Sequence, residues 1–427
     1  MGRLNGQQLE AIKKKLGVDR IWSFSKMSTY EQCSWSYKLK YIDKLRKSGD
    51  SCYTYWGTIS HEIRQDFYDG VYKTNQEMVD KLEEEILTYY TEDKKELKFP
   101  HVGEDENYFN NLRHYFANCT HVPVDVKNEK IVISLIKNGD KKYAFQGYID
   151  SFYELDGKYY ILDYKTSSFS GFSGDKLMEK SQQLMIYAYG LWKMQGIPIE
   201  QIVLRFDMMK YCHVSFMQKN GKIKTTRADR RAWVVAISNQ MRKDFENVEK
   251  DIAVHEKKIA TLSKKMSAKC RTAEEVEGLS VEIGEIESQI QELLKNVYDF
   301  LQVNEMVSEA MDNNDLSNMP QFIQDKYTLE DCYVDVELNE EIITEFIKRI
   351  EGTLDKIVEA ECEDAEQSFA RNRIEDSESY FCNNLCDVRE NCKYYSEYRE
   401  HLTMFLSQKE ESQEDSDDVM MKMLGLA

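Results

Sequence analysis

The chain lacks several features that define other classes of protein. No apolar run approaches the roughly 20 residues that a membrane-spanning helix needs, so the 427 residues do not predict a membrane protein. The first 15 residues are polar and hold no apolar stretch of the kind found in secretory signals, so we expect the protein in the cytoplasm. Positive charge is also scarce. Lys and Arg number 57 against 76 Asp and Glu, a net charge of -19 that argues against a general basic coat.

Prolines are few, and the cysteines do not indicate a disulfide framework. Only four prolines interrupt the chain, so helices should dominate. Ten cysteines in a long cytoplasmic chain favour reduced thiols and a metal site over a disulfide framework. The acidic segment 409–427 is expected to form a disordered tail.

What is present predicts an α/β protein with a mixed central sheet flanked by helices. Ser28 and Glu31 have the spacing of a capping box and predict a helix that continues to about Lys44. Hydrophobic periodicity predicts further helices at 55–70, 76–95, 104–118, 177–195 and 339–368. Runs rich in β-branched and aromatic residues predict strands at 130–137, 143–155, 158–166, 201–209 and 212–217.

Residues 241–301 differ from the rest of the chain. Two apolar series with alternating spacings of four and three residues, from Met241 to Met266 and from Val276 to Phe300, predict an antiparallel coiled-coil hairpin. We interpret it as an insertion at 228–304 between a core part, 1–227, and a C-terminal helical and cysteine-bearing part, 305–408. The hairpin turn is basic, which fits either a solvated hairpin with paired charges or a contact to DNA or a partner.

The most informative stretch holds two aspartates on neighbouring strands. Asp156-Gly157 between two alternating apolar runs predicts a two-residue hairpin turn, which places Asp150 directly opposite Asp163. Like charges at this spacing are destabilising unless a cation lies between them, so the pattern predicts a metal site. Lys165 lies on the same strand face as Asp163. Two metal-binding carboxylates beside an ammonium suit phosphodiester hydrolysis, although an isolated pattern of this kind is more often an ordinary surface hairpin.

Two other motifs accompany this hairpin: Gly57-x-x-x-His61 upstream and Gln183-Leu-x-x-Tyr187 downstream. With Gly147-x-x-Asp150 and Asp163-Tyr-Lys165, this order resembles the RecB-type branch of the PD-(D/E)xK nucleases over about residues 22–217. The resemblance implies a restriction-endonuclease-like fold. It implies that His61, Asp150, Asp163 and the carbonyl of Tyr164 bind Mg²⁺ or Mn²⁺, and that Lys165 is catalytic. It further implies that Gln183 and Tyr187 organise the site and help to hold DNA.

A second signal is the cysteine series Cys382-x3-Cys386-x5-Cys392. Three thiols at these spacings can share a metal centre, and Cys33 is the candidate for the fourth ligand. The surroundings of Cys33 resemble those of the upstream cysteine in iron–sulfur nucleases, which include AddB-like and CRISPR-associated adaptation nucleases. That resemblance implies a 4Fe-4S cluster. Zinc in the same thiols, or unrelated reduced cysteines, are the alternatives.

These patterns lead to a metal-dependent DNA exonuclease of recombination, repair or replication, similar to stand-alone phage or bacterial enzymes. The chain has no G-x-x-x-x-G-K-[ST] motif and hence no helicase motor, so a separate helicase or recombinase partner is expected. Residues 1–50 carry eleven basic and five acidic side chains, and Lys38 and Lys40 are candidates for DNA-backbone contacts. The alternatives are an endonuclease with the same chemistry and a catalytically silent or partner-activated DNA-binding or assembly factor.

Overall fold

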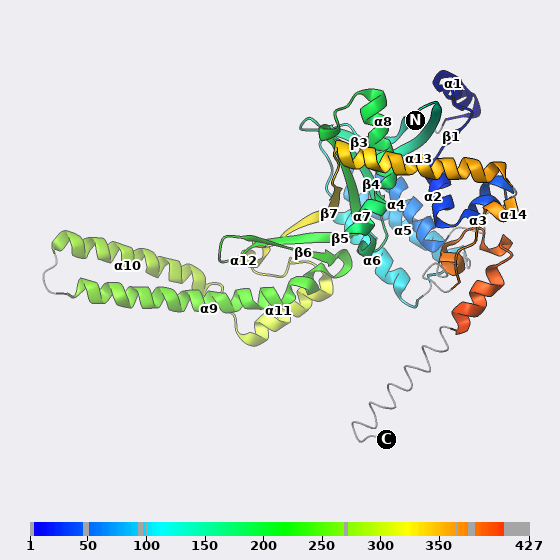
Figure 1. Cartoon of the computed structure of the whole chain (residues 1–427). Coiled ribbons are helices and arrows are strands. Elements are labelled where there is room, and N and C mark those ends of the chain that lie inside the picture. The colour runs from blue at the N-terminus through cyan, green and yellow to red at the C-terminus, as the bar shows by residue number, and fades with distance from the viewer. Residues whose placement is uncertain are drawn as a thin grey trace, which may run out of the picture. The chain divides into compact units, whose positions relative to one another are not determined.

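A computed structural model describes residues 4–45, 51–92, 97–99, 101–268, 272–363, 365–374 and 381–404 (Figure 1). The chain forms two compact units. Unit 1 comprises Met1–Val102, His121–Asp207 and Tyr333–Ala427, and unit 2 comprises Gly103–Thr120 and Met208–Cys332. The expected acidic tail, 409–427, lies outside the described residues. No helix in the described parts of the chain combines the length and apolar character needed to cross a membrane.

Unit 1 contains nine of the α-helices in the described ranges: α1 (Gly6–Leu16), α2 (Phe24–Gln32), α3 (Ser34–Tyr37), α4 (Cys52–Tyr68), α5 (Asn75–Thr91), α7 (Asp175–Lys180), α8 (Gln182–Gln195), α13 (Glu340–Cys362) and α14 (Ala365–Ser368). Unit 2 contains the other five: α6 (Glu104–Asn118), α9 (Trp233–Met266), α10 (Ala273–Leu294), α11 (Phe300–Asn313) and α12 (Gln321–Gln324).

The strands form one mixed sheet of seven: β1 (Ile21–Trp22), β2 (Lys127–Asn138), β3 (Lys141–Leu155), β4 (Lys158–Lys165), β5 (Ile202–Met217), β6 (Ile223–Asp229) and β7 (Thr328–Val336). Their order is β1-β3-β4-β5-β6, with β2 also paired to β3 and β7 to β5. β1 runs parallel to β3, whereas β2 and β4 run antiparallel to it. The predicted mixed α/β architecture is therefore confirmed.

The β3–β4 hairpin has the predicted register. Ser151 pairs with Leu162 and Leu155 with Lys158 around a two-residue turn. Asp156 and Gly157 both have positive φ, 51° and 73°, which is the backbone conformation that this turn requires. The turn therefore aligns Asp150 with Asp163, one step beyond the Ser151–Leu162 pair.

Two local predictions are wrong. The helix expected to begin at Ser28 begins at Phe24, because the hydroxyl of Ser23 accepts the backbone N–H of Lys26 and caps it. It ends at Gln32, since Cys33 has an extended backbone with φ of -162° and ψ of 106°. The segments predicted as strands at 201–209 and 212–217 form one strand, β5. Its two middle residues are compatible with extended structure, so no turn signal separates the halves.

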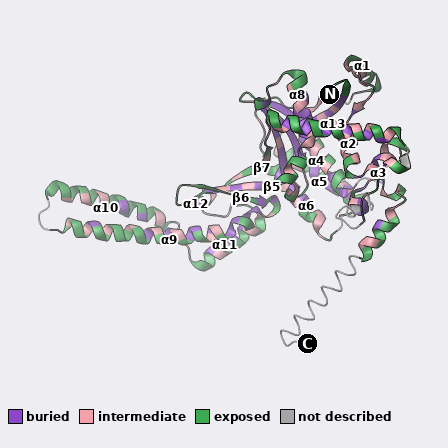
Figure 2. Ribbon diagram, in the orientation of Figure 1, coloured by how far each residue is buried: buried purple, intermediate pink, exposed green. Residues whose placement is uncertain are grey.

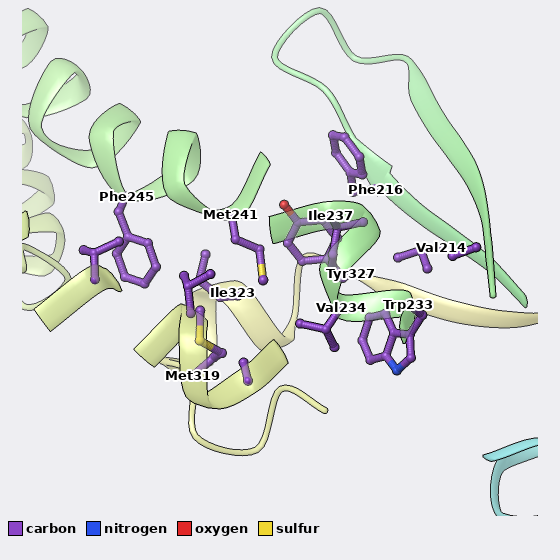
Figure 3. Close-up of a cluster of buried hydrophobic side chains, with 14 of the residues drawn as sticks. Val214, Phe216, Trp233, Val234, Ile237, Met241, Phe245, Met319, Ile323 and Tyr327 are labelled. Atoms are coloured by element: carbon purple, nitrogen blue, oxygen red, sulfur yellow. The ribbon is translucent and has the colours of Figure 1, made fainter. Parts of the chain in front are cut away.

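Unit 2 has its own apolar core. The first half of α9 packs against α11 and the end of β5, with Val307 of α11 in the same buried cluster. Figure 3 shows Trp233 and Met241 of α9 and Phe216 of β5 in this cluster. Beyond that core, α9 and α10 pack along each other, with Val248, Ile252 and Ile290 in a narrow buried stripe (Figure 2). The prediction that the second apolar series continues to Phe300 is wrong. Helix α10 ends at Leu294, and the Phe300 side chain is 79% exposed.

Candidate active site

The β3–β4 hairpin brings two carboxylates and an ammonium together. The Lys165 ammonium lies 2.5 Å from Oδ2 of Asp163, as their shared strand face predicts. Oδ2 of Asp150 accepts the backbone N–H of Tyr164 at 3.3 Å, so the carboxyl of Asp150 reaches across to β4. The side chain of Asp163 is only 10% exposed, whereas that of Lys165 is 30% exposed and remains accessible to a ligand.

Helix α4 supplies an imidazole to the same place. Nε2 of His61 lies 2.7 Å from the carbonyl oxygen of Tyr164, and Nδ1 lies 3.2 Å from Oδ2 of Asp150. A carbonyl oxygen can only accept, so Nε2 carries the proton of that hydrogen bond. His61 therefore contacts two other expected metal ligands, Asp150 and the Tyr164 carbonyl.

The charges of the site shift two pKa values. Burial, followed by the neighbouring Asp163 carboxylate, raises the pKa of Asp150 above its usual range. Burial acts to lower the pKa of Lys165, but the attraction of Asp163 and Asp150 outweighs it and holds the pKa above its ordinary value. The lysine is therefore a stable cation at neutral pH, and the aspartate pair carries more negative charge than the protein alone compensates.

Helix α8 presents Gln183 and Tyr187 to this hairpin. Nε2 of Gln183 donates to the Tyr187 hydroxyl at 2.7 Å. Burial, with smaller contributions from the Asp150 and Asp163 charges, raises the pKa of Tyr187 to about 12. The ring of Tyr187 rests on β3 at Gly147, where a Cβ atom would lie 1.9 Å from Cε1 of the ring. The glycine of the Gly-x-x-Asp motif is thus needed for the close approach of α8 to the sheet.

A buried polar network ties α4 to the other side of the hairpin. Arg64, one helical turn after His61 and 2% exposed, donates to the Tyr68 hydroxyl, and its guanidinium lies 5.5 Å from the centre of the Tyr164 ring. The Tyr164 hydroxyl shares a hydrogen bond of 3.0 Å with the hydroxyl of Ser151. Sequence reasoning missed Arg64, and its position three residues after His61 on a helix was the available signal.

The four cysteines singled out in the sequence line one cavity in unit 1. Cys33, Cys382 and Cys386 are buried, and the Cys33 sulfur accepts the backbone N–H of Ser36 at 3.4 Å. Burial raises the pKa of Cys382 to about 12 and also raises those of Cys33 and Cys392. All nine cysteines in the described ranges are free thiols.

The predicted DNA-binding lysines lie beside this cavity and are already paired. Nζ of Lys38 donates to Oδ2 of Asp43 at 2.8 Å, and Nζ of Lys40 lies 2.5 Å from Oδ1 of Asp387. Their side chains are only 12% and 16% exposed. A phosphate would have to compete with these carboxylates, and the DNA contact of both lysines stays a prediction.

A family model for the PD-(D/E)XK nuclease superfamily matches residues 21–393, most of the chain and both units. The chain belongs to this superfamily. No curated protein matches it. The nuclease thus has the family expected from the motifs, and its mixed sheet flanked by helices is consistent with a restriction-endonuclease-like fold. Members of this superfamily hydrolyse phosphodiester bonds, act on DNA and usually use Mg²⁺ or Mn²⁺. The family match does not extend to the RecB-type branch or to an iron–sulfur cluster.

The donor set of the nuclease fits such an ion by its chemistry. Two carboxylates, a backbone carbonyl and an imidazole are ligands that Mg²⁺ and Mn²⁺ accept. Burial, and after it the Asp163 carboxylate, raises the pKa of Asp150, and a nearby cation would oppose both effects. Within the described ranges, however, no three His, Cys, Asp or Glu side chains are placed to hold a metal ion directly. Holding an ion with His61, Asp150 and Asp163 together would therefore need their side chains to rotate.

Proposed function

We propose that the chain is a metal-dependent DNA exonuclease that acts on single strands or DNA ends in recombination, repair or replication. The observation that carries this proposal is the grouping of Asp150, Asp163, Lys165 and His61 within a chain of the PD-(D/E)XK nuclease superfamily. Because the sequence has no phosphate-binding loop of a motor, a separate helicase or recombinase is proposed to deliver the strand.

Each residue has a distinct proposed role. His61, Asp150, Asp163 and the Tyr164 carbonyl would hold Mg²⁺ or Mn²⁺, which when bound lowers the pKa of water and offsets phosphate charge. Lys165 is a poor general base, because its raised pKa keeps it protonated at neutral pH. It is better suited to stabilise the negative charge that develops on the phosphate. Asp163 orients this ammonium through the 2.5 Å ion pair.

The test is degradation of end-labelled single- and double-stranded DNA with Mg²⁺ or Mn²⁺. Asp163→Asn should lower the cleavage rate at least about 100-fold, because it removes one ligand charge and the partner of Lys165. Asp156→Asn is the matched control. It makes the same change in the exposed turn of the same hairpin, where Asn tolerates the positive φ, and should cut like the wild type.

Two other outcomes have defined meanings. Release of internal fragments from closed circular single strands would replace the exonuclease proposal with an endonuclease. No cleavage by a folded wild type on any substrate would favour the DNA-binding or assembly factor, in which the α9–α10 hairpin is the working part.

We also propose that Cys33, Cys382, Cys386 and Cys392 bind a 4Fe-4S cluster. The support is that Cys33, far from the other three in the sequence, lines the same cavity as Cys382, Cys386 and Cys392. Bound metal would replace the protons that burial retains on Cys33, Cys382 and Cys392. Zinc in the same thiols is the alternative that metal analysis separates from iron.

A further inference from the structure

Unit 1 contains a second hollow, of about 430 Å³, at the turn end of the β3–β4 hairpin. Its lining includes Lys127 and Lys130 from β2, Phe152 from β3, Tyr159 from β4 and Gln195 from the end of α8. We call it the lysine pocket. Its volume lies in the range of small-ligand sites, about 300–1,000 Å³.

The two lysines bring positive charge to this pocket, whose lining also includes the carboxylates of Asp125 and Glu154. Nζ of Lys130 lies 3.3 Å from the centre of the Phe152 ring, so its position is fixed by a cation–π contact. Burial and the nearby charge of Lys127 lower the pKa of Lys130 to about 8. Neither lysine forms an ion pair with any residue in the described ranges, in contrast to Lys38 and Lys40. An anion bound here would relieve the repulsion between the two ammonium groups.

Aromatic surface lies beside these charges. The rings of Phe152 and Tyr159 are stacked, with centres 6.1 Å apart and planes at 21°. Phe152 is 5% exposed and covered by Lys130, whereas Tyr159 is partly exposed. Tyr159 therefore offers a ring to a planar ligand, while Phe152 holds the lysine.

The lysine pocket begins close to the candidate active site along the same strands. Phe152 is two residues beyond Asp150 on β3, and its partner Ile161 is two residues before Asp163 on β4. Two residues of strand span about 7 Å. Lys127 pairs with Phe152 from the other side, on β2. A polyanion whose phosphate lies at Asp150 and Asp163 could place a neighbouring nucleotide here.

We propose that the lysine pocket is a subsite for one nucleotide of a single nucleic-acid strand. Lys127 and Lys130 hold a backbone phosphate, and Tyr159 stacks on the base. This inference rests on the proposed nuclease function for the identity of the ligand. Electrostatic contacts and base stacking together are the usual means by which proteins bind single strands without reading their sequence.

The test measures binding separately from cleavage. Anisotropy of labelled oligothymidylate is followed in the Asp163→Asn protein with Mg²⁺, with and without Lys127→Met and Lys130→Met together. Methionine keeps the apolar stem over Phe152. The double substitution should weaken binding about tenfold. It should also reduce the slope of log affinity against log salt concentration by roughly 0.7 to 1.4, since about 0.7 is lost per phosphate contact on single strands.

The matched control is Lys137→Met with Lys142→Met. These exposed lysines pair with each other at the opposite ends of the same two strands, and their loss should leave affinity unchanged. A second variant, Tyr159→Leu, should restore the fluorescence that 2-aminopurine loses on stacking in a mixed oligonucleotide. Melting curves check that each variant is folded.

The outcomes separate this inference from the nuclease proposal. Unchanged affinity of the Lys127/Lys130 variant overturns the subsite even if the wild type cuts DNA. Weakened binding supports the subsite even if the wild type proves inactive. Failure of the folded Asp163→Asn protein to bind single strands at low salt also overturns it.

Discussion

At the scale of single residues, the candidate site stores electrostatic strain. Asp150 and Asp163 adjoin the Ser151–Leu162 pair of the β3–β4 hairpin, and Lys165 contacts Asp163. The raised pKa of Asp150 means that the folded protein holds this proton more tightly than the unfolded chain does. The same arrangement that prepares the site for a cation therefore costs stability in its absence.

The raised pKa of Asp150 makes the free energy of unfolding depend on pH. The stabilising contribution of the Asp150 proton is fully present below the unfolded pKa, near 4, and is lost as pH rises through the raised folded pKa. Without divalent metal, Asp150→Asn should therefore match the wild type near pH 4. At pH 8 it should be more stable, by on the order of 1–2 kcal/mol. Urea unfolding at both pH values measures the difference.

The effect of Mg²⁺ on the free energy of unfolding tests the same assignment. Added Mg²⁺ should raise the stability of the wild type at pH 8 and have a smaller effect on the variant, because it binds the folded site. A variant no more stable than the wild type at pH 8 would contradict the assignment of strain to Asp150.

At the scale of elements, the site depends on how closely α8 approaches the sheet. Gly147 leaves room for the Tyr187 ring, and Gly190 of α8 lies where a Cβ would be 2.6 Å from a methyl group of Val132. Two glycines on facing elements thus set this distance. In the sequence, Gly147 stands out only as part of a motif. The periodicity of a strand or a helix shows which face a residue occupies but not how closely two elements approach each other.

Gly147→Ala should destabilise the protein by about 1–3 kcal/mol, the usual cost of overpacking. The new methyl group would displace the Tyr187 ring and break its hydrogen bond with Gln183. Urea unfolding and the DNA cleavage rate both report the effect. Adding Tyr187→Leu should recover much of the stability but not the cleavage rate, because only the ring clash is relieved.

Gly57→Ala is the control for this prediction. Its Cβ would meet only Oγ1 of Thr166, at 3.6 Å, and alanine in a helix is favoured over glycine. A Gly147→Ala protein as stable as the Gly57→Ala protein would show that α8 can move away from the sheet without cost.

At the scale of the whole molecule, the proposed cluster would join distant parts of unit 1. Cys33 and Cys382 are separated by 382 − 33 = 349 positions and line the same cavity as Cys386 and Cys392. A metal centre across this separation would remove much of the conformational freedom of the unfolded chain. Loss of the cluster should therefore destabilise unit 1 as a whole.

The matching prediction is a brown protein when purified without oxygen, with absorbance near 400 nm. Cys386→Ala should lose the absorbance and lower Tm by about 5 °C or more. Cys362→Ala, an exposed thiol outside the cavity, should keep both. A colourless protein that contains zinc would show that the site binds zinc and not iron. A protein without either metal would overturn the proposed metal centre.

The β3–β4 hairpin could be predicted from the sequence, because an Asp-Gly turn and strand alternation follow from local spacing alone. They placed Asp150 opposite Asp163 and Lys165 beside Asp163. Local rules failed where signals competed, as at Ser28, where Ser23 five residues earlier caps the helix instead.

Only the tertiary structure decided which distant groups meet. It brought His61 to Asp150 and to the Tyr164 carbonyl, placed Arg64 against the Tyr164 ring, and lined one cavity with four cysteines. It also formed the lysine pocket from β2, β3, β4 and the end of α8. The physical reason is that such contacts depend on the packing distances and angles between elements. Those are set by the complementary shapes of many side chains at once, which no local spacing in the sequence records.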